Sequence, residues 1–296
     1  MELNGVPIDN TFAEAFEGYY SRFLVTAVNK RWVETAAREA TGFGSSVIGC
    51  TAEAGVEQFL KKEETPDGRP GAVLQIWTGR KNMLHELLGR IGQCILTAPT
   101  TAVFDWCEGC EPVDVGNKMR YFADGYESYK KIDGREMVCI PMMMGEFLIE
   151  KDVGMAKGVM GGNFLIMGVS PLKVLRSAEK AAEAIQGCEG VISSFPGGVC
   201  APGSKVGSKK YKFMKATTNE LYCPTLTTLV PETKVPSGVD AIAEIVINGV
   251  SRDAVMTAMK KGIEAATKVS GVKMISAANY GGTLGNVHIN LHDLWR

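Results

Sequence analysis

Glu244 is the residue whose chemistry is least expected from its neighbours, because it lies inside the apolar run AEIVING. A carboxylate within an apolar strand is costly unless it is paired, protonated or used in a reaction. Burial raises the pKa of a carboxyl group, so a buried Glu244 is a candidate general acid or base near neutral pH. A glutamate that faces solvent on an edge strand explains the same pattern equally well.

Glycine-rich turns beside expected strands form a second group of candidates: SFPGGVC (194–200), ANYGGTLG (278–285) and GVMGGNF (158–164). Glycine allows backbone N–H groups to approach a ligand closely, as an oxyanion hole requires. Each turn by itself is weak evidence of a site, because most glycine turns only reverse the chain.

The segment SKVGSKKYKFMK, at 204–215, concentrates positive charge in a glycine-containing loop. Its lysines are Lys205, Lys209, Lys210, Lys212 and Lys215. Such a loop suits a phosphate or a polyanionic tail, and a solvated surface loop has the same composition. It is not a P-loop, because the spacing departs from G-x-x-x-x-G-K-[ST] and no Ser or Thr follows the lysine.

Neither the histidines nor the cysteines have the spacing of a metal site. His288 and His292 lie in the alternating run NVHINLHDLW, and on a regular strand they would be about 13 Å apart. Cys107 and Cys110 form one C-x-x-C, but no second pair follows it. We therefore expect no metal and interpret the eight cysteines mostly as buried free thiols.

The composition excludes several classes of function. Lys plus Arg number 32 and Asp plus Glu number 33, and the net charge of −1 argues against a nucleic-acid binder. Hydrophobic residues make up 45% and charged residues 22%, which is typical of a globular protein. No apolar run reaches the roughly 18 residues of a membrane span, and no secretory signal is visible. We expect a cytoplasmic protein that binds neither nucleic acid nor membrane.

The elements that would position these residues follow an internal repeat. In the first half we expect helices at 29–42 and 81–91 and strands at 21–28, 45–50, 72–79 and 93–98. In the second half we expect helices at 171–187 and 251–269 and strands at 162–169, 190–195, 241–249 and 272–278. Both halves have the β-α-β-β-α-β order of the ferredoxin-like unit, in which two helices cover one face of a four-stranded sheet.

The predicted fold class is therefore α+β, with two ferredoxin-like lobes related by the repeat and long insertions at 50–71, 99–161 and 197–239. The length of 296 residues fits two domains of about 150 residues each, which we assign to 1–150 and 151–296. Aligning the halves sets Glu244 opposite Leu74, so only the C-terminal lobe carries the glutamate. Insertions this long usually serve function or oligomerisation.

A series of short strings extends the pattern over nearly the whole chain: DNTFAEAF (9–16), ATGFGSSVI (40–48), AEAG (52–55), EETPDGRPG (63–71), RIGQCILTAPTTAVF (90–104), GEFLIE (145–150), GGNF (161–164), FPGGV (195–199), GSKVGSKKYKF (203–213), TNELYCPT (218–225), EIVING (244–249), NYGG (279–282) and LHDL (291–294). In their number, order and spacing these strings resemble the formylmethanofuran:tetrahydromethanopterin N-formyltransferase family.

The resemblance implies reversible transfer of a formyl group between formylmethanofuran and N5 of tetrahydromethanopterin, in the C1 metabolism of methanogens and related organisms. It implies that both C1 carriers are cosubstrates, that no cofactor is permanently bound, and that the protein is a homotetramer. The glutamate of the EIVING motif is the family's proposed acid/base residue, and it corresponds to Glu244.

Backbone donors in the FPGG and NYGG motifs are our hypothesis for substrate orientation and oxyanion stabilisation, with the lysine loop holding an anionic tail. The candidate substrate-binding residues are Phe195, Pro196, Gly197, Gly198, Ser204, Lys205, Asn279, Tyr280, Gly281 and Gly282.

Three positions depart from the usual family pattern: Thr51 in CTAEAG, Pro202 in VCAPGSK and Thr283 in NYGGTLG. Thr283 stands where a lysine is common, so its presence would alter anion binding beside a cleft. A competing hypothesis is a non-catalytic subunit that binds C1 carriers within a larger formyl-transferring or hydrolysing complex. Turnover by the isolated chain separates that hypothesis from the enzyme.

Overall fold

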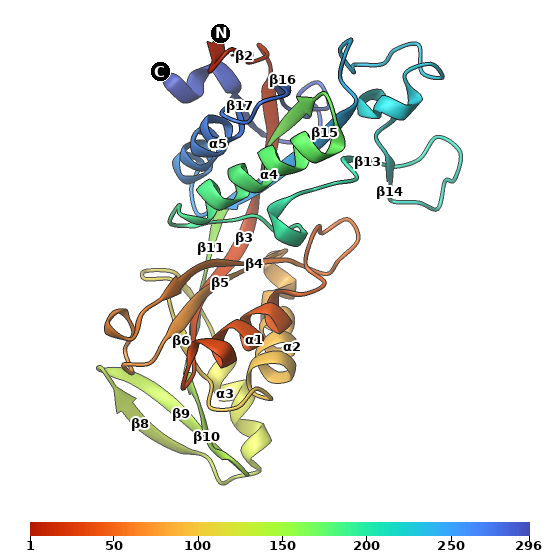
Figure 1. The fold of residues 1–296 in the computed structure, drawn as a ribbon. Coiled ribbons are helices and arrows are strands. Elements are labelled where there is room, and N and C mark those ends of the chain that lie inside the picture. Colours follow the sequence, from red (N-terminus) through yellow and green to blue (C-terminus); the bar gives the residue numbers. More distant parts are fainter. The chain divides into compact units, whose positions relative to one another are not determined.

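A computed structural model describes the chain over residues 1–296. Its residues form two compact units: the inner unit, Gly18–Lys157, and the terminal unit, which joins Met1–Glu17 to Gly158–Arg296. Two long strands, β3 (Phe12–Thr26) and β11 (Val153–Gly168), contribute residues to both units (Figure 1). We describe each unit separately.

The N-terminal residues belong to the terminal unit because of strand pairing. The strand β17 (Val287–Asn290) runs antiparallel to residues 12–15 of β3, and Ile8 bridges Ile275. The short hairpin of β1 (Glu2–Leu3) and β2 (Val6–Pro7) precedes them. This grouping differs from a division at residue 150, which would assign the same residues to the first half.

The inner unit contains β3, α1 (Lys30–Thr41), β4 (Glu53–Leu60), β5 (Gly71–Thr78), α2 (Met83–Arg90) and β6 (Ala102–Asp105). The strands are antiparallel in the order β4-β5-β3-β6. Helix α1 begins where the Asn29 side chain accepts a hydrogen bond from the Trp32 N–H. Phe23 and Leu74 share a buried cluster with Val33 and Leu87 of the helices, so α1 and α2 cover one face of this sheet.

A second group of elements completes the inner unit: β7 (Glu111–Val113), α3 (Val115–Met119), β8 (Ser128–Ile132), β9 (Arg135–Met142) and β10 (Gly145–Glu150). The strand β10 pairs in parallel with β6 and antiparallel with β9, which in turn pairs with β8. The strand β7 pairs with Val153–Met155 of β11. Short 3-10 turns lie at Lys62–Glu64, Arg80–Asn82 and Arg120–Ala123.

The terminal unit contains β11, α4 (Pro171–Gln186), β12 (Val191–Ile192), β15 (Ala241–Gly249), α5 (Arg252–Ala266) and β16 (Val272–Ser276). The strands are antiparallel in the order β12-β15-β11-β16, the same relative order as in the inner unit. Ser170 and Ser251 cap the two helices, which lie side by side (Figure 1). The long connection before β15 holds a small hairpin, β13 (Ser204–Val206) and β14 (Ala216–Thr218).

Two strands expected in the first half were wrong. Residues 45–50 form turns, in which the Cys50 N–H donates to the Ser46 carbonyl and the Val47 N–H donates to the Glu53 carboxylate. The strand at this place in the repeat is β4, which follows these turns. Helix α2 continues into a π-helical turn, Ile91–Ile95, residues 96–98 form a turn, and the following strand is β6. A short buried apolar run fits either a helix or a strand, so its sequence alone does not decide between them.

The expected strand through both C-terminal histidines was also wrong. β17 ends at Asn290, and Leu291–Trp295 form a 3-10 helix that carries His292. The Nε2 atom of His288 contacts the Gly285 carbonyl, and that of His292 contacts the Ile8 carbonyl. Both rings therefore serve the packing of this unit.

The interpretation of the cysteines as mostly buried free thiols needs correction. Cys107 and Cys110 form a disulfide, with the Cys110 N–H donating to the Cys107 carbonyl in a tight turn over Gly154. Among the free thiols, Cys139, Cys188 and Cys200 are buried, whereas Cys50, Cys94 and Cys223 are partly exposed. The C-x-x-C motif pairs because the turn brings its two Cα atoms to 5.5 Å.

Candidate functional site

Glu244 lies on the face of its sheet that the helices do not cover. Its neighbours Ala243 and Ile245 are in the cluster formed with α4 and α5, and successive strand residues face opposite sides. β15 is an inner strand, between β12 and β11, so the edge-strand interpretation is wrong.

The register also corrects the alignment of the two halves. Glu244 pairs with Leu165 and Val73 pairs with Leu24, and Leu165 and Leu24 each lie five residues before a helix N-cap. Leu74, in contrast, faces the helices of the inner unit. Val73, a buried apolar residue, is therefore the counterpart of Glu244.

The surroundings of the Glu244 carboxyl favour its protonated form. Leu165, beside it on β11, belongs to an apolar cluster with Met167 and Val239, and no cation lies within ion-pair distance. Although part of the residue's surface is accessible, protein atoms surround the carboxyl, and this burial raises its pKa to about 7. Both the acid and the base form are therefore populated at neutral pH.

Cys200 is the side chain that hydrogen-bonds Glu244, and no motif in the sequence indicated this contact. It is 2% exposed and forms an antiparallel bridge with Glu244, its N–H donating to the Glu244 carbonyl over 2.8 Å. Its thiol hydrogen-bonds the Glu244 carboxyl, which opposes the effect of burial on the pKa of the carboxyl.

A segment from Cys200 to Val206 passes over the carboxyl and meets Tyr280. Gly203 has a φ of +50°, and a Cβ there would lie 4.0 Å from Oε2 of Glu244. The Tyr280 hydroxyl accepts a hydrogen bond from the Val206 N–H over 3.3 Å. Burial raises the pKa of Tyr280, and the negative charge of Glu244 adds to that rise. The structure thus brings Glu244, Ser204 and Tyr280 together.

Lys205 is occupied by an ion pair within the protein. Its Nζ lies 2.7 Å from Glu220 and also donates to the Thr217 hydroxyl over 2.9 Å. Lys209 binds the other oxygen of Glu220 at 2.7 Å, and the two lysines lower the pKa of Glu220 to about 2. All lysines of this loop after Lys205 are exposed, namely Lys209, Lys210, Lys212 and Lys215, and of these Lys209 pairs with Glu220.

The NYGG turn is organised around Glu14, a buried carboxylate that sequence reasoning missed. The N–H groups of Tyr280, Gly282, Leu284 and Gly285 all donate to the Glu14 carboxylate, and these bonds lower its pKa although burial opposes them. The Gly281 N–H donates to the Asn279 side chain. Because these N–H groups already have acceptors, the geometry argues against their use as oxyanion donors.

The FPGG turn, Phe195–Gly198, folds back on itself next to helix α4. The Gly198 N–H donates to the Phe195 carbonyl over 2.8 Å, and Pro196 has no N–H. Gly197 and Gly198 both have positive φ, and a side chain at Gly198 would contact Ala182 of α4. The glycines are therefore needed for the turn and its close approach to the helix.

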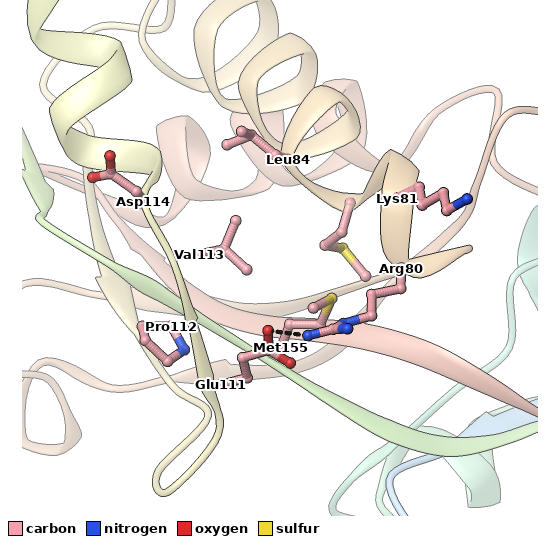
Figure 2. A pocket seen from close by; sticks show the side chains of 9 residues that line it. Arg80, Lys81, Leu84, Glu111, Pro112, Val113, Asp114 and Met155 are labelled. Atoms are coloured by element: carbon pink, nitrogen blue, oxygen red, sulfur yellow. Dashed lines mark hydrogen bonds and ion pairs between the residues drawn. The ribbon is translucent and has the colours of Figure 1, made fainter.

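A pocket of about 390 Å³ lies in the inner unit and holds none of the predicted site residues. Figure 2 shows the ion pair between Arg80 and Glu111, with Met155 beside it. The distance from Arg80 Nη2 to Glu111 Oε1 is 2.5 Å. The chain has no group of three or more His, Cys, Asp or Glu residues that could hold a metal ion. No helix has the length and apolar character needed to cross a membrane.

Comparison with known proteins assigns this arrangement to a family. A family model for formylmethanofuran-tetrahydromethanopterin formyltransferase matches residues 1–142, and the model for the proximal lobe of the same protein matches residues 145–294. The chain belongs to this family.

Two curated relatives match over the full length of both chains. The formylmethanofuran–tetrahydromethanopterin formyltransferase of Methanothermobacter thermautotrophicus is 54% identical and that of Methanococcoides burtonii is 52% identical, each over 100% of both sequences. The chain is therefore an enzyme that transfers a formyl group, as its full-length relatives are.

Two solved structures are also similar. The formyltransferase of Methanosarcina barkeri superposes with a TM-score of 0.97 at 50% identity, covering 99% of this chain and 100% of that one. A chain of the formyltransferase/hydrolase complex of Methylorubrum extorquens, solved with methylofuran, superposes with a TM-score of 0.95 at 40% identity, covering 100% and 99%. The α+β fold class is thereby confirmed.

Proposed function

We propose that this formyltransferase moves a formyl group reversibly between formylmethanofuran and N5 of tetrahydromethanopterin, with Glu244 as the acid/base residue. The observation that carries the proposal is a carboxyl without a cation partner, with a pKa near 7, in a chain whose full-length relatives bear this enzyme's name. The two carriers are cosubstrates, and no permanently bound cofactor is invoked.

The reaction needs one proton to move from the attacking amine to the leaving amine. The N5 lone pair attacks the formyl carbon, a new C–N bond forms, and the carbonyl electrons move onto oxygen as a tetrahedral oxyanion. When the oxyanion collapses, the C–N bond to the methanofuran amine breaks and that amine leaves with a proton. A group with a pKa near 7 suits this sequence, because it accepts the proton from the attacking amine and returns it to the leaving amine.

We propose different tasks for the substrate-binding candidates according to what their polar groups already do. The Tyr280 hydroxyl and Ser204 are polar groups near Glu244 that are suited to contact a substrate. Lys205 holds its loop through Glu220, and Gly282 holds the NYGG turn through Glu14. Asn279 donates to the Phe12 carbonyl and accepts from the Gly281 N–H. Phe195 to Gly198 form a turn that sets the start of the segment leading to Cys200.

We further propose that each unit is a ferredoxin-like lobe, that an internal repeat relates the two lobes, and that the protein assembles as a homotetramer. The shared strand order of the two units supports the first point. Apolar side chains of the inner unit that are at least 60% exposed support the assembly, because a subunit contact would remove their apolar surface from water: Tyr121, Phe122, Tyr126, Tyr129, Met143 and Met144. Cytoplasmic location, and the absence of nucleic-acid and membrane partners, stay predictions from the sequence.

The deciding experiment mixes the purified chain with formylmethanofuran and tetrahydromethanopterin and follows formation of the formyl-pterin by absorbance. We expect turnover by the isolated chain. Substrate binding without turnover, and activity only after other subunits are added, would favour the non-catalytic subunit instead. The names of the full-length relatives favour the enzyme.

A further inference from the structure

The contact between Cys200 and Glu244 is held by an isolated backbone bridge to β15 and not by side chains alone. The Cys200 N–H donates to the Glu244 carbonyl over 2.8 Å, and the Glu244 N–H donates to the Cys200 carbonyl over 3.4 Å. Residues that exchange both backbone bonds in an antiparallel bridge point their side chains to the same face, about 5 Å apart. The thiol is therefore held beside the carboxyl by the backbone.

The thiol also connects the carboxyl to the segment above it. Burial and the neighbouring carboxylate raise the pKa of Cys200 to about 12, so its sulfur keeps its proton at neutral pH and donates it to Glu244. The same sulfur accepts hydrogen bonds from the N–H groups of Gly203 and Ser204. One side chain thus links Glu244 to the segment on which Ser204 lies.

No other side chain performs this task. Leu165 faces the carboxyl from β11, and Gly203 faces it without a side chain. Among titratable groups, Cys200 is the one that hydrogen-bonds the Glu244 carboxyl, whereas Tyr280 interacts with Glu244 through charge and its oxygen accepts the Val206 N–H. Lys205 is held by Glu220.

We propose that Cys200 is a positioning residue for Glu244: its thiol stabilises the carboxylate form and fixes the carboxyl relative to residues 203 and 204. This inference rests on the proposed role of Glu244 as acid/base residue. It assigns to a buried thiol a part in the proton transfer without direct contact with the substrate.

The test compares the pH dependence of kcat in Cys200→Ala and Cys200→Ser, with formylmethanofuran and tetrahydromethanopterin as substrates. Loss of the donor destabilises the carboxylate, so the limb assigned to Glu244 shifts to higher pH in Cys200→Ala, by about half a unit or more. A serine hydroxyl replaces the donor, so the limb in Cys200→Ser returns toward that of the unchanged protein. The matched control is Cys139→Ala, a buried free thiol of β9. An unshifted limb in Cys200→Ala, or the same shift in the control, overturns the proposal.

A second measurement needs neither turnover nor the alanine variant. The infrared S–H stretching band of Cys200, identified by its loss in Cys200→Ser, changes frequency as Glu244 ionises, and this change disappears in Glu244→Gln. A band that does not respond to pH overturns the proposal even if Cys200→Ala does not fold. Full activity of Glu244→Gln would refute the catalytic role of Glu244, and the infrared result would still decide whether the thiol serves the carboxyl.

Discussion

Glu57 in the inner unit and Glu244 in the terminal unit are two carboxylates on the helix-free face of similar sheets, and their surroundings are opposite. Glu57 lies at a bulge of β4, where Arg22 binds both of its oxygens at 2.6 and 2.8 Å. Gln75 donates to it over 2.7 Å, and Trp77 donates to Gln75. Glu244 has no cation and only a thiol as its side-chain donor.

This difference separates a carboxylate that holds a fold together from one that is available for chemistry. An arginine that donates two matched hydrogen bonds satisfies both oxygens of a buried carboxylate. A carboxyl surrounded by apolar atoms without a cation exchanges its proton near neutral pH instead. The repeat therefore provides two sheets of one design, and only the terminal unit leaves its carboxylate unpaired.

The largest effect is expected for Glu244→Gln, which keeps the shape and removes the exchangeable proton. Because general acid/base catalysis contributes about 10²- to 10⁴-fold, kcat falls by that factor while substrate affinity changes little. Steady-state kinetics with both cosubstrates measure it. The control is Glu146→Gln, an exposed residue of β10 paired with Lys130, and an unchanged kcat in Glu244→Gln would remove Glu244 from the mechanism.

Next in size is the loss of stability in Glu57→Gln, which leaves the Arg22 charge without its partner in the inner unit. We expect the free energy of unfolding to fall by about 3 kcal/mol, measured by denaturant titration. The folded fraction keeps its kcat, in contrast to Glu244→Gln. A loss of kcat without a loss of stability would reverse the roles that we assign to the two glutamates.

Glu244 also makes the stability of the protein depend on pH. The folded protein holds the pKa of Glu244 at about 7, above its ordinary value of 4.5, so folding favours the protonated form. Its contribution to stability is complete at pH values below 4.5 and is lost as the pH rises through 7. Relative to Glu244→Gln, the unchanged protein loses about 2 kcal/mol between roughly pH 5 and 8. Parallel stability curves for the two proteins would contradict this prediction.

The smallest effect concerns Glu220, a paired carboxylate of the terminal unit outside the sheet. Lys205 and Lys209 lower its pKa to about 2, so its contribution to stability is present above pH 4.5 and is lost as the pH falls toward 2. We expect Glu220→Gln to lower the free energy of unfolding at neutral pH by about 1 kcal/mol and to speed proteolysis between residues 204 and 218. Glu232→Gln, in an exposed part of the same connection, is the control. Equal proteolysis rates for the two variants would show that the ion pairs do not hold this loop.

Much of the architecture could be predicted, and the failures have a common cause. Helices α1, α4 and α5 were predictable because their caps, Asn29, Ser170 and Ser251, and their apolar spacing are local features. The strand at 93–98 failed because QCILTA satisfies helix and strand alike, and β4 was missed because its glutamates and glutamine suggested a polar loop. Glu53 and Glu57 are buried there, and for Glu57 a partner 35 residues away, Arg22, makes this possible.

The sequence by itself determined the family, the order of elements and the prominence of Glu244, because motifs, caps and periodicity depend on neighbouring residues. Only the tertiary structure decided what surrounds each charge. In the folded chain Cys200 contacts Glu244, 44 residues away, and Lys205 forms an ion pair with Glu220. Glu14 accepts hydrogen bonds from a turn 266 residues away. The pKa of a group depends on burial and on charges nearby in space, and chain folding alone fixes those distances.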